Sequence, residues 1–103
     1  TASAVEKTDG IALQYELSKN YPNPFNPSTQ IKYGLAKSGM VTLKVYDVVG
    51  RLVTTLVDGY QEVGKYTVTF NTAEKAFGLS SGVYFYRLES GSFISVDKMM
   101  LLK

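Results

Sequence analysis

Three residue types are missing from this sequence, which contains no cysteine, no histidine and no tryptophan. Without cysteine the chain has no disulfide and no thiol nucleophile. Without histidine it lacks the usual zinc ligand and the only side chain that ordinarily titrates near neutral pH. The serine pair Ser80–Ser81 consequently has no histidine to activate it. We therefore predict a protein with no catalytic residues, no metal centre and no cofactor.

The sequence also has little excess of positive over negative charge. The 11 basic and 9 acidic residues leave a net charge of +2, and only Arg51 and Arg87 are arginines. A nucleic-acid-binding surface needs clustered lysines and arginines, so we expect no nucleic-acid partner. No stretch approaches the roughly 18 apolar residues that span a membrane. Residues 1–10 lack the apolar core of a signal peptide. If the protein is exported, we expect this chain to be a fragment of a longer polypeptide that carries the signal.

What the sequence does contain is a two-residue alternation of apolar and polar side chains. From Ile11 onward turn residues interrupt this alternation about every 8 to 12 residues, which is typical of a sandwich or barrel. The residues expected to face inward are Leu13, Tyr15, Leu17, Thr29, Ile31, Tyr33, Leu35, Val41, Leu43, Val45, Tyr66, Val68, Phe70, Tyr84, Tyr86 and Leu88. We predict an all-β, immunoglobulin-like antiparallel β-sandwich of about seven strands over residues 12–103, preceded by a polar linker tail at residues 1–11.

The last predicted strand has a phase slip. Ile94 and Val96 fall on one face of a regular strand, whereas Met99 and Leu101 fall on the other. Because one extra residue restores the register of a strand, we expect a β-bulge near Asp97–Lys98.

All three prolines lie in the segment Tyr21–Pro27. Proline fixes φ, has no N–H to donate and holds the preceding residue in an extended conformation. We predict a rigid, non-helical connection in which Tyr21 and Phe25 pack as plugs.

In the segment 51–57 two leucines and two valines fall on opposite faces of a regular strand. The sequence does not decide which of these two faces points inward.

Tyr84 stands at the start of the sixth expected strand, two residues after Gly82. In immunoglobulin-like folds a tyrosine near this position turns its hydroxyl back onto the upstream backbone, an arrangement called a tyrosine corner. We predict this scaffold role for Tyr84.

Other side chains suggest alternatives that the sequence leaves open. Four aromatic residues are candidates for an exposed patch: Tyr46, Tyr60, Phe85 and Phe93. Such rings stack on sugars, so the alternative function is a carbohydrate-binding or cell-attachment module, although the lack of tryptophan argues against it. We expect the carboxylates of Asp47, Asp58 and Glu62 to lie at turns and to cap backbone amides there. Glycosidase chemistry needs two carboxylates about 5 to 10 Å apart in a cleft, so we do not expect it.

Several motifs, taken in order, resemble the C-terminal sorting domain of type IX (Por) secretion cargo, type A. They are Tyr21–Thr29, Val45–Asp47 with Gly50–Arg51, Leu56–Gly59, Ser81–Leu88, and Lys98–Met99 with Leu101–Lys103. The resemblance covers about residues 12–103. That family is similar in turn to the immunoglobulin-like domain of the flagellar hook-capping protein, so a spacer or cap-like assembly domain is a third possibility.

The resemblance implies a function and a set of partners. It implies an upstream cargo domain in the same chain, which passes from the periplasm through outer-membrane translocon components to the outer membrane surface or is secreted. It also implies a sortase-like peptidase that cleaves within residues 1–11. The residues that the resemblance assigns to translocon recognition are Gly82, Val83, Tyr84, Lys98, Met99, Met100, Leu101, Leu102 and Lys103.

Overall fold

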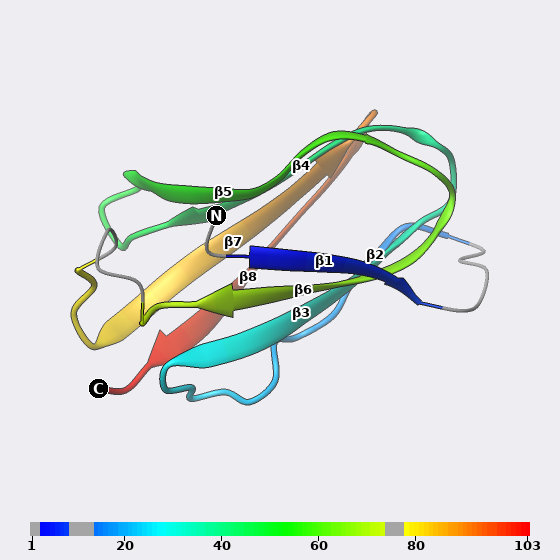
Figure 1. The fold of residues 1–103 in the computed structure, drawn as a ribbon. Helices are drawn as coiled ribbons and strands as arrows, with labels where there is room; N and C mark the ends of the chain where they lie inside the picture. Colours follow the sequence, from blue (N-terminus) through cyan, green and yellow to red (C-terminus); the bar gives the residue numbers. More distant parts are fainter. Residues whose placement is uncertain (1–2, 9–13, 74–77) are drawn as a thin grey trace.

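Two layers of antiparallel strands make up the protein in this computed structural model, which describes residues 3–8, 14–73 and 78–103 (Figure 1). The strands are β1 (Ser3–Thr8), β2 (Glu16–Leu17), β3 (Ser28–Leu35), β4 (Gly39–Tyr46), β5 (Leu52–Gln61), β6 (Gly64–Asn71), β7 (Gly82–Ser90) and β8 (Phe93–Leu101). Sheet A has the order β1-β6-β3-β2 and sheet B the order β5-β4-β7-β8. The predicted antiparallel sandwich is confirmed, and the described residues form eight strands in place of about seven. No helix in the described ranges is long and apolar enough to cross a membrane.

The faces predicted from the alternation are the faces that the two sheets bury against each other. Every residue predicted to face inward in β3, β4, β6 and β7 is buried, from Thr29 in β3 to Leu88 in β7. Within sheet A the rings of Tyr33 and Tyr66 stack, with 5.4 Å between their centroids. Burial of one large apolar side chain contributes roughly 1.5–3 kcal/mol, so this shared interior is the main source of stability.

The inward face of β5 is decided by irregularities in its pairing with β4. The register shifts twice along this pair, once after Leu43 and once after Val45. At a β-bulge two residues of one strand oppose a single residue of its partner, so neighbouring side chains no longer have to alternate. Leu56 and Val57 are both buried as a result, a combination that strict alternation excludes.

The terminal strand β8, in contrast, is regular. It pairs with β7 in one unbroken register from Phe93 to Leu101, so the predicted bulge near Asp97–Lys98 is wrong. Because the backbone keeps its alternation, the apolar side chains of Ile94 and Val96 point outward and are 52% and 55% exposed. The two apolar residues that cause the phase slip in the sequence are therefore exposed and are not part of the core.

The N-terminal segment contains a strand that the alternation did not reveal. Residues 1–11 are predicted as a linker, and the structure places β1 within this range, paired along its length with β6. The side chains of Val5, Glu6 and Lys7 are all exposed, so these residues are held through the backbone pairing with β6. Leu13 lies outside the described residues, and the domain boundary after residue 11 stays a prediction.

The proline segment Tyr21–Pro27 lies between β2 and β3 and is non-helical. Phe25 is only 1% exposed, and its ring centroid lies 6.1 Å from that of Phe70. The predicted plug is thus confirmed for Phe25. It is wrong for Tyr21, whose side chain is 81% exposed. The backbone of Tyr21 exchanges two 2.9 Å hydrogen bonds with Gln30, so this residue is held by its main chain while its ring lies in solvent.

Candidate functional site

The proline segment covers the outer edge of β8. The backbone N–H of Phe25 donates to the Met100 carbonyl oxygen at 2.9 Å, and the Phe25 carbonyl accepts the Leu102 N–H at 3.0 Å. Asn23 Oδ1 accepts the N–H of Met100 at 3.0 Å. These edge groups already have partners inside the protein, so residues 100–102 do not present a free edge for the addition of another strand.

The nine residues predicted for translocon recognition lie side by side, because the start of β7 pairs with the end of β8. The buried members are Tyr84, Met99 and Leu101. The exposed members are Lys98, Met100, Leu102 and Lys103, and Gly82 and Val83 are half-buried. A partner that meets the folded domain can touch the exposed and half-buried members, whereas the buried members form part of the core that holds them in place.

The hydroxyl of Tyr84 fixes the loop that leads into this region. It donates to the backbone carbonyl oxygen of Ser80 at 2.7 Å, which confirms the predicted tyrosine corner. Gly82, between the two residues, has a φ of 150°, a conformation that other residues rarely adopt. The loop is therefore held by a glycine that permits the backbone path and a tyrosine that closes it.

A second corner of the same kind, which the sequence analysis missed, precedes β6. The Tyr66 hydroxyl donates to the Glu62 carbonyl oxygen at 2.7 Å, and Gly64 has a φ of 148°. The sequence signal that could have found it is a glycine two residues before a tyrosine that opens a strand. Both corners share this spacing, one in each sheet.

A buried polar cluster anchors the start of the proline segment. The backbone N–H of Asn20 donates to the Tyr86 hydroxyl oxygen at 3.0 Å, and that hydroxyl donates to the Ser18 carbonyl oxygen at 2.9 Å. The Asn20 side chain donates to Thr29 Oγ1 at 3.0 Å, and Thr29 Oγ1 donates to the Pro22 carbonyl oxygen at 2.8 Å. Burial raises the pKa of Tyr86 to about 12, so the phenol stays protonated. The sequence analysis assigned no role to Asn20.

The four aromatics predicted as an exposed patch do not gather in one place. Tyr46 and Phe85 are direct cross-strand partners in sheet B. Tyr60 is exposed and lies near the C-terminal end of β5, whereas Tyr46 pairs with the N-terminal end of that strand. Phe93 instead stacks on Tyr15, with 5.0 Å between the ring centroids, and both rings pack against the core. The structure thus brings together two of the four residues.

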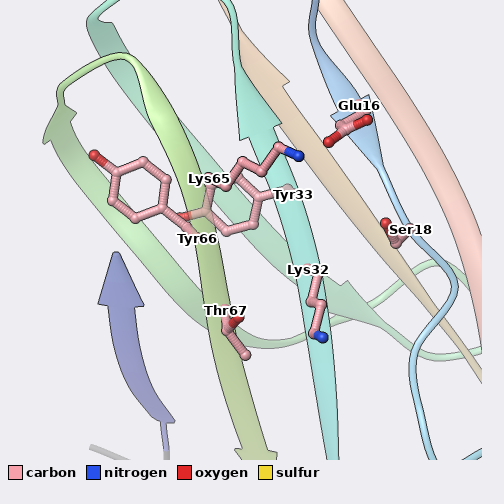
Figure 2. Close-up of a pocket in the computed structure, with 7 residues that line it drawn as sticks. All are labelled: Glu16, Ser18, Lys32, Tyr33, Lys65, Tyr66 and Thr67. Carbon is pink, nitrogen blue, oxygen red and sulfur yellow. The ribbon is translucent and has the colours of Figure 1, made fainter. Parts of the chain in front are cut away.

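A polar pocket of about 340 Å³ lies on sheet A (Figure 2). Its lining residues are Glu16, Ser18, Lys32, Tyr33, Lys65, Tyr66 and Thr67. The ammonium groups, the carboxylate and the hydroxyls suit a small polar ligand, and none of these hydroxyls has a histidine to activate it. In the part of the chain that the structure describes, no group of three or more histidine, cysteine, aspartate or glutamate side chains is placed to hold a metal ion.

Residues 19–102 match a family model described as a secretion system C-terminal sorting domain. The chain belongs to this family. It is the type IX family that the motifs resemble. The matched range begins after β2 and contains the proline segment, both corners and nearly all of the terminal region. A search of curated proteins found no match to the chain.

Membership of this family indicates the general role of the domain. A type IX sorting domain is a C-terminal signal for export to the cell surface or for secretion, and it presupposes an upstream cargo and the type IX machinery. The family is not catalytic.

Proposed function

We propose that the domain docks as a rigid unit onto outer-membrane translocon components through the exposed side chains at the end of β8. An upstream cargo in the same chain would follow it from the periplasm to the outer membrane surface or into the medium. The single observation that carries the proposal is the covered edge of β8. Because the proline segment already bonds the backbone of Met100 and Leu102, recognition is left to side chains.

The exposed side chains suit this role. Lys98, Met100, Leu102 and Lys103 combine two cationic groups with two apolar ones. Lys103 is further positioned by a 2.8 Å hydrogen bond from its backbone N–H to Ser81 Oγ. The buried members of the predicted site contribute indirectly, because they fix the strand from which the exposed ones project.

We place removal of the domain by a sortase-like peptidase within residues 1–11. This range includes β1, an edge strand whose Val5, Glu6 and Lys7 side chains are exposed. A strand held mainly by backbone bonds at a sheet edge opens more readily than a central strand. This arrangement supports access of a peptidase to the segment without unfolding of the sandwich.

The first test is export of a reporter. A periplasmic reporter protein is fused upstream of residues 1–103 in a host with a working type IX system, and its amount outside the cell is measured. We expect export that depends on the fusion. A reporter that stays in the periplasm, while the host exports its own cargo, would contradict the proposal.

The second test separates recognition from folding. Truncation of the strand is a poor test, because loss of a buried leucine such as Leu101 costs about 2–5 kcal/mol of stability. The double variant Lys98→Glu with Leu102→Asp changes exposed side chains alone. Its matched control, Lys32→Glu with Val63→Asp, makes the same charge reversal and a similar aliphatic-to-aspartate change at exposed positions elsewhere. We expect the first variant to lose export and the control to keep it, with equal unfolding temperatures.

A further inference from the structure

The two sheets present outer faces of different chemistry. The outer face of sheet A carries polar side chains, among them Gln30, Lys32 and Thr67. On sheet B the exposed apolar side chains are Met40, Leu52, Tyr60, Ile94, Val96 and Met100, joined by Val48 and Val49 in the β4–β5 turn. The strand pairing places polar side chains such as Thr42, Lys44 and Glu89 between some of them, so they form separate groups, one of which lies beside the β4–β5 turn. An exposed apolar group on a protein surface is a candidate interaction site.

A groove lies on this outer face beside the β4–β5 turn. It has a volume of about 390 Å³, and its lining residues are Tyr46, Asp47, Val48, Val49, Gly50, Phe85, Arg87 and Val96. The pairing of β4 with β7 and of β7 with β8 sets two rows across the sheet. One row runs from Tyr46 through Phe85 to Lys98, and the next contains Arg87 and Val96. The aromatic pair Tyr46 and Phe85 thus lies beside the row that contains Arg87.

The apolar part of the groove is not explained by the core. Val96 belongs to the stretch of β8 whose apolar residues fall on the outward face, and Val49 is exposed in the turn on the other side. Neither side chain contributes to the buried core. Exposed valines at both rims of a groove favour a partner that covers them.

The charges around the groove favour an acidic occupant. Lys44, Arg87 and Lys98 project from the same face, which also carries Asp58 and Glu89 in a neighbouring row. Asp47 lines the groove but is already paired with Arg51 at 2.9 Å, so Arg87 is the charged lining residue left for a ligand. Arg87 Nε is buried and, within the described residues, has no hydrogen-bond partner. The nearest carboxylate contact of this guanidinium is a long one, 3.6 Å from Nη2 to Glu89 Oε2. The Arg87 side chain is 40% exposed, so a docked carboxylate can reach the accessible part of its planar guanidinium, which is suited to carboxylates.

We propose that the outer face of sheet B docks a protein segment that presents an apolar side chain next to a carboxylate. The apolar group lies against Phe85 and Val96, and the carboxylate accepts hydrogen bonds from Arg87. The inference rests on the proposed function, since it takes this segment to be part of the export machinery. It adds a second contact face beside the end of β8.

Two other occupants fit the observations less well. A second copy would have to bring a carboxylate of this face, Asp58 or Glu89, onto Arg87, and both lie in the row on the far side of Arg87 from Tyr46 and Phe85. A membrane surface prefers apolar side chains that protrude, whereas here a concave groove separates Val49 from Val96. The segment of a protein partner is therefore the occupant that the shape and the charge favour.

The test uses the reporter fusion described above. The double variant Val49→Glu with Val96→Glu places carboxylates at the rims of the groove, where they compete for Arg87. The matched control, Gln30→Glu with Val63→Glu, adds two carboxylates at exposed positions away from sheet B. We expect export to fall about tenfold or more for the groove variant, as for a docking hot spot, and the control to export like wild type.

Folding is checked by thermal unfolding of each purified 103-residue chain. A third variant, Arg87→Gln, removes the cation without adding charge, and we expect it to reduce export as well. Arg87→Lys keeps the charge but loses the planar donor pair, and we expect partial export.

The outcomes separate the two proposals. Failure of the wild-type fusion to be exported overturns the proposed function and this inference with it. Normal export of wild type and of a folded groove variant overturns the inference alone, as does equal loss in groove variant and control. Size-exclusion chromatography and flotation with phosphatidylethanolamine–phosphatidylglycerol vesicles complete the test. Wild-type dimerisation or vesicle binding that the groove variant abolishes would assign the face to a second copy or to a membrane instead.

Discussion

The backbone N–H of Leu102 donates a 3.0 Å hydrogen bond to the carbonyl oxygen of Phe25. This bond joins two segments that lie far apart in the sequence, the proline segment and the end of β8. It makes them one structural unit, because Phe25 also bonds to Met100 and fills the core beneath the strand. The family motif at Tyr21–Thr29 and the motif at the end of the chain are thus the two halves of one arrangement.

The first prediction concerns Asn23, whose side chain accepts the N–H of Met100. The change Asn23→Ala removes this acceptor, and a hydrogen bond of this kind contributes about 1 kcal/mol. We expect faster hydrogen exchange of the Met100 amide, measured by NMR, with little change in the centre of β7. Asn26→Ala, an exposed change in the same segment, is the control. Equal exchange rates in the two variants would show that Asn23 does not hold the strand.

The second prediction concerns the corner at Tyr84. Tyr84→Phe keeps the buried ring and removes the hydroxyl bond to Ser80. We expect a loss of about 1 kcal/mol in the free energy of unfolding, measured by denaturant titration. Tyr21→Phe, at a side chain that is 81% exposed, should leave stability unchanged. A Tyr84→Phe protein with the wild-type unfolding midpoint would refute the scaffold role.

The third prediction is a loss of stability at alkaline pH. Burial raises the pKa of Tyr86 to about 12, whereas a tyrosine in an unfolded chain ionises near pH 10. Between these values the unfolded state binds fewer protons than the folded state, so the free energy of unfolding falls as the pH rises. The slope contributed by one such group is at most about 1.4 kcal/mol per pH unit.

The matching variant is Tyr86→Phe, which has no phenol to ionise. We expect it to be less stable than wild type at pH 9, because it leaves the Asn20 N–H without its partner. Its stability should also fall less steeply between pH 10 and 12. Parallel pH profiles for wild type and variant, from urea unfolding at each pH, would contradict the buried-phenol explanation.

The fourth prediction concerns the turn after β4. Asp47 Oδ1 accepts the backbone N–H groups of Val49 and Arg51, each at 2.9 Å, and Oδ2 accepts Arg51 Nε at 2.9 Å. The backbone bond from Arg51 is the main cause that lowers the pKa of this carboxyl. The carboxylate therefore supports the fold above the pKa of the unfolded chain, and this support is lost as the pH falls through the lowered value.

We expect the Asp47 pKa, measured by NMR titration of its carboxyl carbon, to lie below the ordinary aspartate value. In Arg51→Ala the backbone N–H is retained, so most of the depression should remain. Return of the pKa to its ordinary value in that variant would show that the guanidinium was the main cause instead.

The alternation of side chains was enough to predict the fold class and most of the core. In β3, β4, β6 and β7 each inward residue is buried as expected. A strand that packs one face against the opposite sheet buries every second side chain. The tyrosine corner at Tyr84 was also predictable, since a glycine and a tyrosine at close spacing carry it within one loop. Each of these features depends on residues that are close together in the sequence, so a short sequence pattern is enough to predict it.

The tertiary structure alone decided the features that depend on distant partners. Which edge of β8 is covered follows from its bonds to Asn23 and Phe25, and backbone pairing of this kind leaves no period in a sequence. The same reason applies to β1, which is held through its backbone to β6. The outward position of Ile94 and Val96 was settled by the unbroken register with β7, whereas the order of apolar residues along the chain had favoured a bulge.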